Sequence, residues 1–259
     1  MGALATLAQA MAGGSVRTVD LTFTLDPDFP VLVLPQELGQ CEPFRVEEVS
    51  RYDARGPGWY WQNFTCNEHT GTHFDAPIHW ISGRDLPNNS VDTIPVERFV
   101  APAVVADFSA ECAADEDFVL TAAHVQAWEE SHGKIAAGSW FLFRTDWSKR
   151  EPAAYLNLRG DGAHSPGPDA GALEYLIHEA GIVGFGVETI GTDAGQGEHF
   201  DPPHPAHLLL HGNNRYGLQC LRNLDQLPPV GAMLICAPLK IKQGSGSPLR
   251  VLALVEETP

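Results

Sequence analysis

His69-Thr-Gly-Thr-His73-Phe-Asp75-Ala-Pro77-Ile-His79 packs three histidines and an aspartate into eleven residues, and no ordinary helix or strand needs that density. Histidine is the commonest metal ligand, and a carboxylate beside it suits a divalent ion that does not require sulfur. Gly71 can adopt backbone angles closed to other residues, and Pro77 stops a helix from running through the segment. The run therefore predicts a bent loop that holds a metal, and with it a metallohydrolase.

An alternative interpretation treats these side chains as ordinary surface groups. His73 and His79 could be exposed histidines, and Asp75 could be a turn residue before Pro77. His69 and His73 would share a face only in a helix, which the glycine and the β-branched threonines disfavour. We favour the metal interpretation because so many ligand side chains rarely fall together by chance.

The length and composition of the chain limit the classes of protein to which it can belong. Its 259 residues are enough for one large α/β domain or two small ones, and 44% hydrophobic residues support a packed core. The net charge of −17 argues against nucleic acid or an anionic membrane surface as a partner. No apolar run is long enough to span a bilayer.

The cysteines and the N-terminal segment bear on location and domain organisation. The five cysteines lie far apart, without a Cys-x-x-Cys pair, which fits reduced thiols and a cytoplasmic protein. The segment 1–15 is rich in Ala and Leu and lacks the basic start of a signal peptide, so we expect a short helix or arm. We expect residues 16–259 to form the functional domain.

The pattern of apolar residues predicts many strands and few helices. Strands are expected over 16–25, 44–50, 59–65, 103–107, 138–145, 182–189, 233–241 and 249–255, the last two paired. Helices are expected over 122–130, with Thr121 as N-cap, from Pro168 to Gly181, and over 205–211. This count favours a sheet-rich, single-domain α/β fold.

The signature His-x-Gly-Thr-His-x-Asp-x-Pro-x-His is that of the metal-dependent cyclase family, and every one of its positions is present in the run 69–79. Three further segments resemble the family: Val19 to Thr22, Gly186 to Asp193, and Asn223 to Pro228. The family includes enzymes that act on N-formylkynurenine and on isatin. The resemblance implies a cyclase-like swivelling β/β/α fold.

The resemblance also implies roles for the residues of the run. His69, His73 and Asp75 correspond to the metal ligands, and His79 is left as the residue that transfers protons. A neutral imidazole can accept a proton from water and pass it to a leaving amine near pH 7. The alternative is that His79 only packs under Trp80.

Two positions farther along the chain decide the number of metals. In kynurenine formamidases a histidine and, twelve residues later, a glutamate help to hold a second metal; here these positions are His207 and Gln219. A neutral amide offers an oxygen but no charge, so we expect one metal per chain, with Gln219 as a ligand and His207 beside the substrate. The glutamine resembles the isatin-hydrolysing members, in which it helps to bind a single manganese. We expect Mn²⁺, with Zn²⁺ as the alternative, although Gln219 could instead hold another ligand in place.

An aromatic run precedes the metal loop by about ten residues. Trp59 and Trp61 could form an apolar wall for a planar substrate, and Asn63 could bind its carbonyl group. A strand face packed in the core, or an interface between two subunits, would explain the same aromatic residues equally well.

The resemblance implies hydrolysis of a small aromatic amide, such as the opening of isatin to isatinate by metal-activated water, with His79 moving the proton. The absence of Gly-x-Ser-x-Gly disfavours a serine acyl-enzyme. An arylformamidase acting on N-formylkynurenine is the alternative enzyme, and a non-catalytic metal-binding or small-molecule-binding protein is the alternative class. We expect a homodimer or a higher homo-oligomer.

Overall fold

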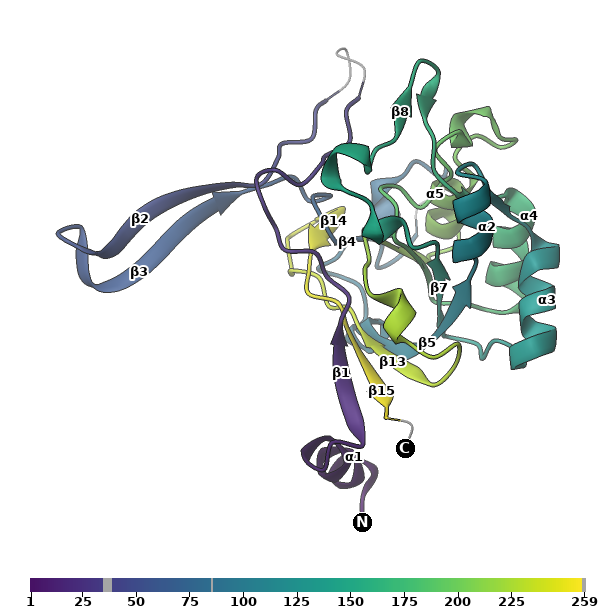
Figure 1. Ribbon diagram of the computed structural model, residues 1–259, viewed down its shortest axis with the longest axis horizontal. Helices are drawn as coiled ribbons and strands as arrows, with labels where there is room; N and C mark the ends of the chain where they lie inside the picture. Colours follow the sequence, from purple (N-terminus) through teal and green to yellow (C-terminus); the bar gives the residue numbers. More distant parts are fainter. Residues whose placement is uncertain (35–38, 85, 258–259) are drawn as a thin grey trace.

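The computed structural model describes residues 1–34, 39–84 and 86–257, and among them nine strands form one large mixed sheet (Figure 1). The order across the sheet is β1-β15-β13-β5-β7-β11-β12-β4-β14. In chain order the strands are β1 (Val16–Asp20), β4 (His73–Asp75), β5 (Val100–Asp107), β7 (Trp140–Arg144), β11 (Gly184–Val187), β12 (Tyr216–Gln219), β13 (Ala232–Ile235), β14 (Gly246–Pro248) and β15 (Leu252–Glu256). The central strands β5, β7, β11 and β12 are mutually parallel, and the outer pairs are antiparallel.

The central strands are apolar on both faces because both faces are covered. In β7, Trp140 and Leu142 pack in one hydrophobic cluster, whereas Phe141 and Phe143 pack in another on the opposite face. Successive side chains of a strand point to opposite faces, so a continuous apolar run is what a buried parallel strand requires.

Helices cover the face of the sheet that carries Phe141 and Phe143, and α2 to α5 lie together on one side of the molecule in Figure 1. The α-helices are α1 (Ala3–Ala12), α2 (Ser109–Ala114), α3 (Ala122–His132), α4 (Ala170–Glu174) and α5 (Pro205–Gly212). The short 3-10 or π-helical segments are η1 (Pro77–His79), η2 (Val96–Phe99), η3 (Trp147–Lys149), η4 (Pro152–Ala154), η5 (Tyr175–Glu179), η6 (Gly197–His199) and η7 (Leu224–Gln226). In the described part of the chain, none of these helices has the length and apolar content needed to cross a membrane.

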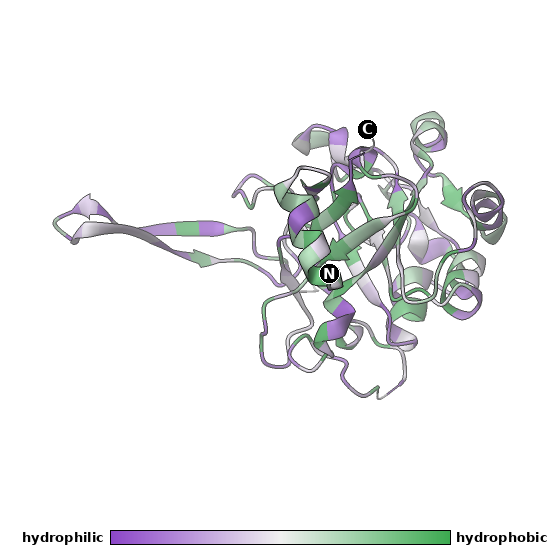
Figure 2. Cartoon of the chain, turned by 90° about the horizontal axis from the view of Figure 1, so that it is seen from below, coloured by the Kyte–Doolittle hydropathy of each residue, from purple (hydrophilic) through white to green (hydrophobic). Residues whose placement is uncertain are grey.

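A long hairpin, here called the arm, projects from the body of the molecule (Figures 1 and 2). It consists of β2 (Arg45–Asp53) and β3 (Gly56–Thr65), which pair only with each other among the described residues. Every residue of β3 after Gly56 is exposed. Two further small sheets pair β6 (Val119–Leu120) with β10 (Gly167–Pro168) and β8 (Leu158–Arg159) with β9 (Gly162–Ala163).

The mixed α/β fold with one large sheet confirms the predicted fold class, and the predicted elements are present with shifted ends. The pairing of the last two strands is confirmed, since β13 and β15 are antiparallel neighbours. The Thr121 side chain caps α3 as expected. The helix expected from Pro168 to Gly181 is divided, because α4 passes into the π-helical η5 before the chain turns at Gly181. The segment 1–15 contains α1, and its division from the rest of the chain stays a prediction.

Candidate metal centre

The short strand β4 brings the central residues of the signature into the sheet. It lies between β12 and β14, with Gly217 and Gly246 both in register with Asp75. Phe74 is fully buried in the core, so His73 and Asp75 point to the opposite face of the sheet. Gly71, with a φ of 66°, supplies the left-handed turn that precedes the strand.

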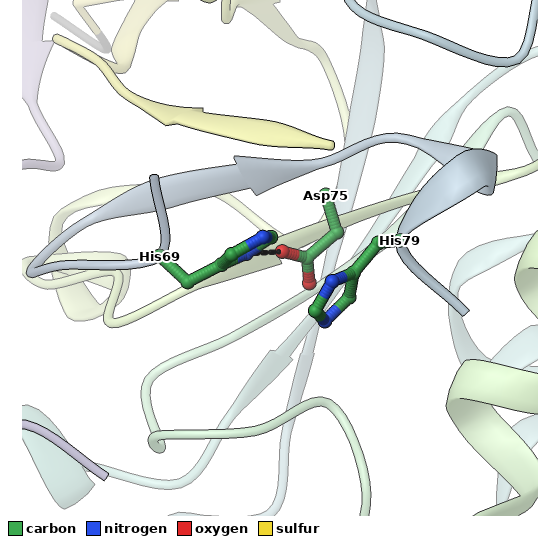
Figure 3. A group of neighbouring side chains, drawn as sticks. All are labelled: His69, Asp75 and His79. Atoms are coloured by element: carbon green, nitrogen blue, oxygen red, sulfur yellow. Dashed lines mark hydrogen bonds and ion pairs between the residues drawn. The ribbon is translucent and has the colours of Figure 1, made fainter. Parts of the chain in front are cut away.

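The 3-10 segment η1 then returns the chain toward the same point. Pro77 begins this segment, and the next turn places His79 beside His69, with their rings stacked at a centroid distance of 3.9 Å. Figure 3 shows His69, Asp75 and His79 converging, and each offers one ligand atom within 4.8 Å of the others. The bend predicted from Gly71 and Pro77 is therefore what gathers the polar side chains.

His73 has a free, buried ring nitrogen that suits a cation. Its Nδ1 lies 2.8 Å from the carbonyl oxygen of Gly71, which can only accept, so Nδ1 carries the hydrogen. Its Nε2 is buried, lies 3.3 Å from Oδ1 of Asp75, and has no hydrogen-bond partner among the described residues. Such an unpaired buried lone pair is costly unless something not contained in the protein chain binds it.

Asp75 provides the charge at the centre of this group. Burial opposes its ionisation, but positive charge at the neighbouring His73 and His69 holds the pKa of its carboxyl group well below the usual range. A bound cation would supply that charge when both imidazoles are neutral. Its Oδ1 lies 2.8 Å from Nδ1 of His69. Two imidazole nitrogens and one carboxylate oxygen thus converge in a buried position, and this donor set fits a divalent ion such as Zn²⁺ or Mn²⁺.

Gln219 reaches the group, but in a different way from the one predicted. β12 places it opposite His73, and its Nε2 donates to Oδ2 of Asp75 at 2.5 Å. Its Oε1 accepts a hydrogen bond from the backbone N–H of Gly191 at 2.7 Å. The amide oxygen is therefore turned away from the convergent nitrogens, and the geometry matches the alternative in which Gln219 holds the carboxylate ligand Asp75.

His79 lies close enough to serve either as a ligand or as a proton carrier. Burial lowers the pKa of its imidazole to about 3, with the nearby histidines acting in the same direction and Asp75 acting against them. The ring is accordingly neutral near pH 7 and presents a lone pair, as a proton acceptor must. It also faces His207 and His211, at centroid distances of 5.6 and 6.0 Å.

His207 is held by a carboxylate on the far side of its ring. Its Nδ1 lies 2.5 Å from Oδ2 of Asp193, and Oδ1 of the same carboxylate accepts from the backbone N–H of Ala206 in the first turn of α5. Burial works against protonation of His207, but the hydrogen bond to Asp193 raises its pKa. This hydrogen bond fixes His207 beside His79.

Two residues of this centre were not singled out as candidates from the sequence. Trp80 packs against His207 at a centroid distance of 4.7 Å and against His204 at 5.4 Å, so it forms an aromatic wall of the histidine cluster. His211 is fully buried, with Nδ1 on the carbonyl oxygen of Arg215 and Nε2 without a partner among the described residues. The available signals were weak: Trp80 follows the signature directly, and His211 lies one helical turn after His207.

The structure does not bring the predicted aromatic wall to the metal loop of the same chain. Trp59 and Trp61 are 50% and 58% exposed, and they contact each other on the arm. Asn63 is also exposed and pairs in register with Glu47 of β2. A hairpin with no helix or second sheet beneath it has no core to bury these rings, so a substrate-binding role within one chain is not supported for these three residues.

These features define the class of protein to which the chain belongs. The cyclase family model matches residues 19–194, and the chain belongs to this family.

Three similar proteins are all isatin hydrolases. The isatin hydrolase of Roseibium aggregatum is 50% identical over 256 residues, which cover 98% of this chain and 97% of the relative. The structure of isatin hydrolase A from Labrenzia aggregata, bound to benzyl benzoate, is 62% identical with a TM-score of 0.97, covering 99% of this chain and 100% of the other. An isatin hydrolase bound to the product analogue thioisatinate is 49% identical with a TM-score of 0.96 and the same coverage.

Kynurenine formamidases are more distant relatives. The enzyme of Salinibacter ruber is 28% identical over 202 residues, which cover 74% of this chain and 77% of the relative.

Proposed function

We propose that this chain is a metal-dependent hydrolase that opens the cyclic amide of isatin to give isatinate. The observation that carries the proposal is the convergence of His69 Nδ1, His73 Nε2 and Asp75 Oδ1 in a chain that is 50% identical to an isatin hydrolase over nearly its whole length. Neighbouring hydrogen bonds fix the orientation of each of these groups, so the centre is organised before any substrate arrives.

We assign His69, His73 and Asp75 as the residues that hold the metal, one ion per chain. Mn²⁺ is our first choice and Zn²⁺ the alternative, since imidazole and carboxylate ligands suit both ions. When bound, the ion supplies Lewis acidity, which polarises a carbonyl oxygen and makes water a stronger nucleophile at neutral pH. Gln219 is neutral and adds no charge that would favour a second cation, so it supports a single-metal centre.

His79 is the residue we assign to proton transfer. In the overall reaction water adds to the amide carbon, the bond from that carbon to the ring nitrogen breaks, and the departing nitrogen takes up a proton. The imidazole of His79 lies against His69 and Asp75, where it can accept the proton from water and deliver it to that nitrogen. His207, fixed by Asp193, and the ring of Trp80 line the same cluster and are positioned to orient a planar substrate.

The alternative enzyme is an arylformamidase that acts on N-formylkynurenine, and the more distant formamidase relatives support it less strongly. A non-catalytic metal-binding protein is a third possibility.

Turnover of isatin and of N-formylkynurenine should be compared on the metal-depleted protein and after addition of Mn²⁺ or Zn²⁺. We expect metal-dependent turnover with isatin as the preferred substrate. Preference for N-formylkynurenine would favour the alternative enzyme, and no turnover of either substrate would favour the non-catalytic protein.

The arm supports the proposal that the protein works as a homodimer. A two-stranded hairpin alone is marginally stable in water, yet this one carries Trp59, Trp61 and Phe64 with half or more of each surface exposed. A second copy of the chain would cover these rings, and in that assembly they could also contribute to the partner's substrate site.

We further propose a cytoplasmic location, which the free thiols of all five cysteines support.

A further inference from the structure

We propose that Glu68 and Ser245 form a positioning pair that fixes the ring of His69 and reserves its Nδ1 for the metal. The inference rests on the metal-dependent function proposed above and deepens it, because it names residues outside the signature that set metal affinity. Ser245 comes from the loop before β14, far from the signature in sequence, and belongs to a Gly-Ser-Gly-Ser run at 244–247.

The three side chains form a continuous chain of hydrogen bonds. Oγ of Ser245 lies 2.6 Å from Oε2 of Glu68, and the backbone N–H of Ser245 donates to the same oxygen at 3.0 Å. On its other side, Oγ of Ser245 lies 2.9 Å from Nε2 of His69. Ser245 thus bridges a carboxylate and a metal-binding imidazole.

The direction of these hydrogen bonds follows from which groups can donate. A carboxylate only accepts, so the hydroxyl hydrogen of Ser245 goes to Glu68. Oγ of Ser245 then offers only lone pairs toward His69, and Nε2 of His69 must carry the hydrogen. In a neutral imidazole this leaves Nδ1 as the bare nitrogen, which faces Oδ1 of Asp75 at 2.8 Å.

Two electron-rich atoms at this separation repel each other unless a cation lies between them. With His73 turned by the carbonyl group of Gly71, the two histidines direct opposite ring nitrogens, Nδ1 of His69 and Nε2 of His73, toward the same carboxylate oxygen. Hydrogen bonds on the far side of metal-bound imidazoles select the tautomer and raise the basicity of the ligand in this way.

The backbone around Ser245 is shaped for this contact. Gly246 is in register with Asp75, and the carbonyl oxygen of Ser245 accepts from the N–H of Ala76 at 2.9 Å. A Cβ atom at position 246 would lie 2.6 Å from Cε1 of His69 and 2.5 Å from the carbonyl oxygen of Phe74. Only glycine allows β14 to lie this close to the imidazole, and this approach places Oγ of Ser245 on its Nε2.

The order Ser245, His69, Asp75 has the side chains of a serine hydrolase triad, but it does not have the required proton arrangement. In such a triad the histidine accepts the hydrogen of the serine hydroxyl. Here Glu68 takes that hydrogen and the facing nitrogen of His69 already carries one. The geometry therefore points to a positioning role for Ser245 and not to a nucleophile.

The test compares Ser245→Ala and Glu68→Gln with the wild type and with Ser247→Ala. Ser247 is the matched control because it lies two residues after Ser245, in β14, but bonds to Leu239 and Pro248. The dissociation constant for Mn²⁺ is measured by chelator competition, and the melting temperature is measured on the metal-free proteins. We expect Mn²⁺ affinity to fall about 10–100-fold in both test variants, with metal-free melting temperatures close to wild type. Ser247→Ala should lower the melting temperature without weakening metal binding.

Wild-type Mn²⁺ affinity in Glu68→Gln, or an equal loss of affinity in Ser247→Ala, would overturn the positioning pair while leaving the proposed function intact. Failure of the wild type itself to retain any divalent metal would overturn both. Glu68→Gln keeps the test decisive if Ser245→Ala does not fold.

Discussion

The metal loop and the arm are both rich in side chains that are often functional, yet the fold buries the first and leaves the second exposed. Residues 70–77 are buried without interruption, and their polar groups are held by β12, β14 and their flanking loops. Residues 57–65 of the arm are exposed without interruption. A local motif becomes a site only where distant segments supply its hydrogen-bond partners. Among the described residues of the same chain, the arm has no such partners.

The largest effect is expected from His73, whose free nitrogen is the clearest sign of a metal site. His73→Ala should remove both the bound metal and the isatin turnover, because no other group occupies that buried position. Elemental analysis and an isatin assay on the same sample measure the outcome. His178→Ala, at an exposed position on η5, is the control and should match wild type. Retained metal in His73→Ala would show that the loop binds the ion without His73.

Replacing His79 separates proton transfer from metal binding. His79→Ala should lower kcat by about 10²–10⁴-fold, the usual contribution of a general acid–base group, while metal content stays near one per chain. The readouts are kcat and metal content. Since a ring nitrogen of His79 lies near His69 and Asp75, loss of metal in this variant would identify His79 as a ligand instead.

Gln219 tests the single-metal centre. Gln219→Glu places a second carboxylate against Oδ2 of Asp75 and removes a hydrogen-bond donor, so the variant should attract an additional cation. We expect isatin turnover to fall about 10–100-fold, the scale for partners of metal ligands, and metal content to exceed one per chain when metal is in excess. Gln226→Glu adds the same charge at an exposed position and is the control. One metal per chain and wild-type turnover in Gln219→Glu would show that Gln219 does not determine the number of bound metals.

The arm carries the smallest expected effect on chemistry. The double substitution Trp59→Ser and Trp61→Ser should weaken self-association by about tenfold or more, since buried aromatic residues dominate interface energies. Light scattering over a dilution series measures association, and Leu158→Ser, at an exposed apolar position of the body, is the control. A raised KM for isatin with association unchanged would instead show that the arm lines a substrate site.

The features that depend on residues close together in the sequence could be predicted. The interval from His69 to His79 predicted the bend and the convergence of its side chains. Among the described residues, the apolar runs predicted six of the nine strands of the large sheet, but not β4, β12 or β14. Sequence reasoning could not place Ser245 on His69 or the amide of Gln219 on Asp75, because these contacts depend on strand register across distances of well over a hundred residues. Nor could it tell that Trp80 would pack on the histidine cluster while Trp59 and Trp61 would lie on an exposed hairpin, since the same residue type serves both situations.

The central claim is that a metal held by His69, His73 and Asp75 is required for opening isatin. The direct measurement is isatin turnover against bound metal, with the protein depleted by a chelator and then titrated with Mn²⁺ or Zn²⁺. We expect turnover to vanish on depletion and to return in proportion to bound metal, with a break at about one ion per chain. Full turnover by the metal-depleted protein, or a break at two ions per chain, would contradict the account.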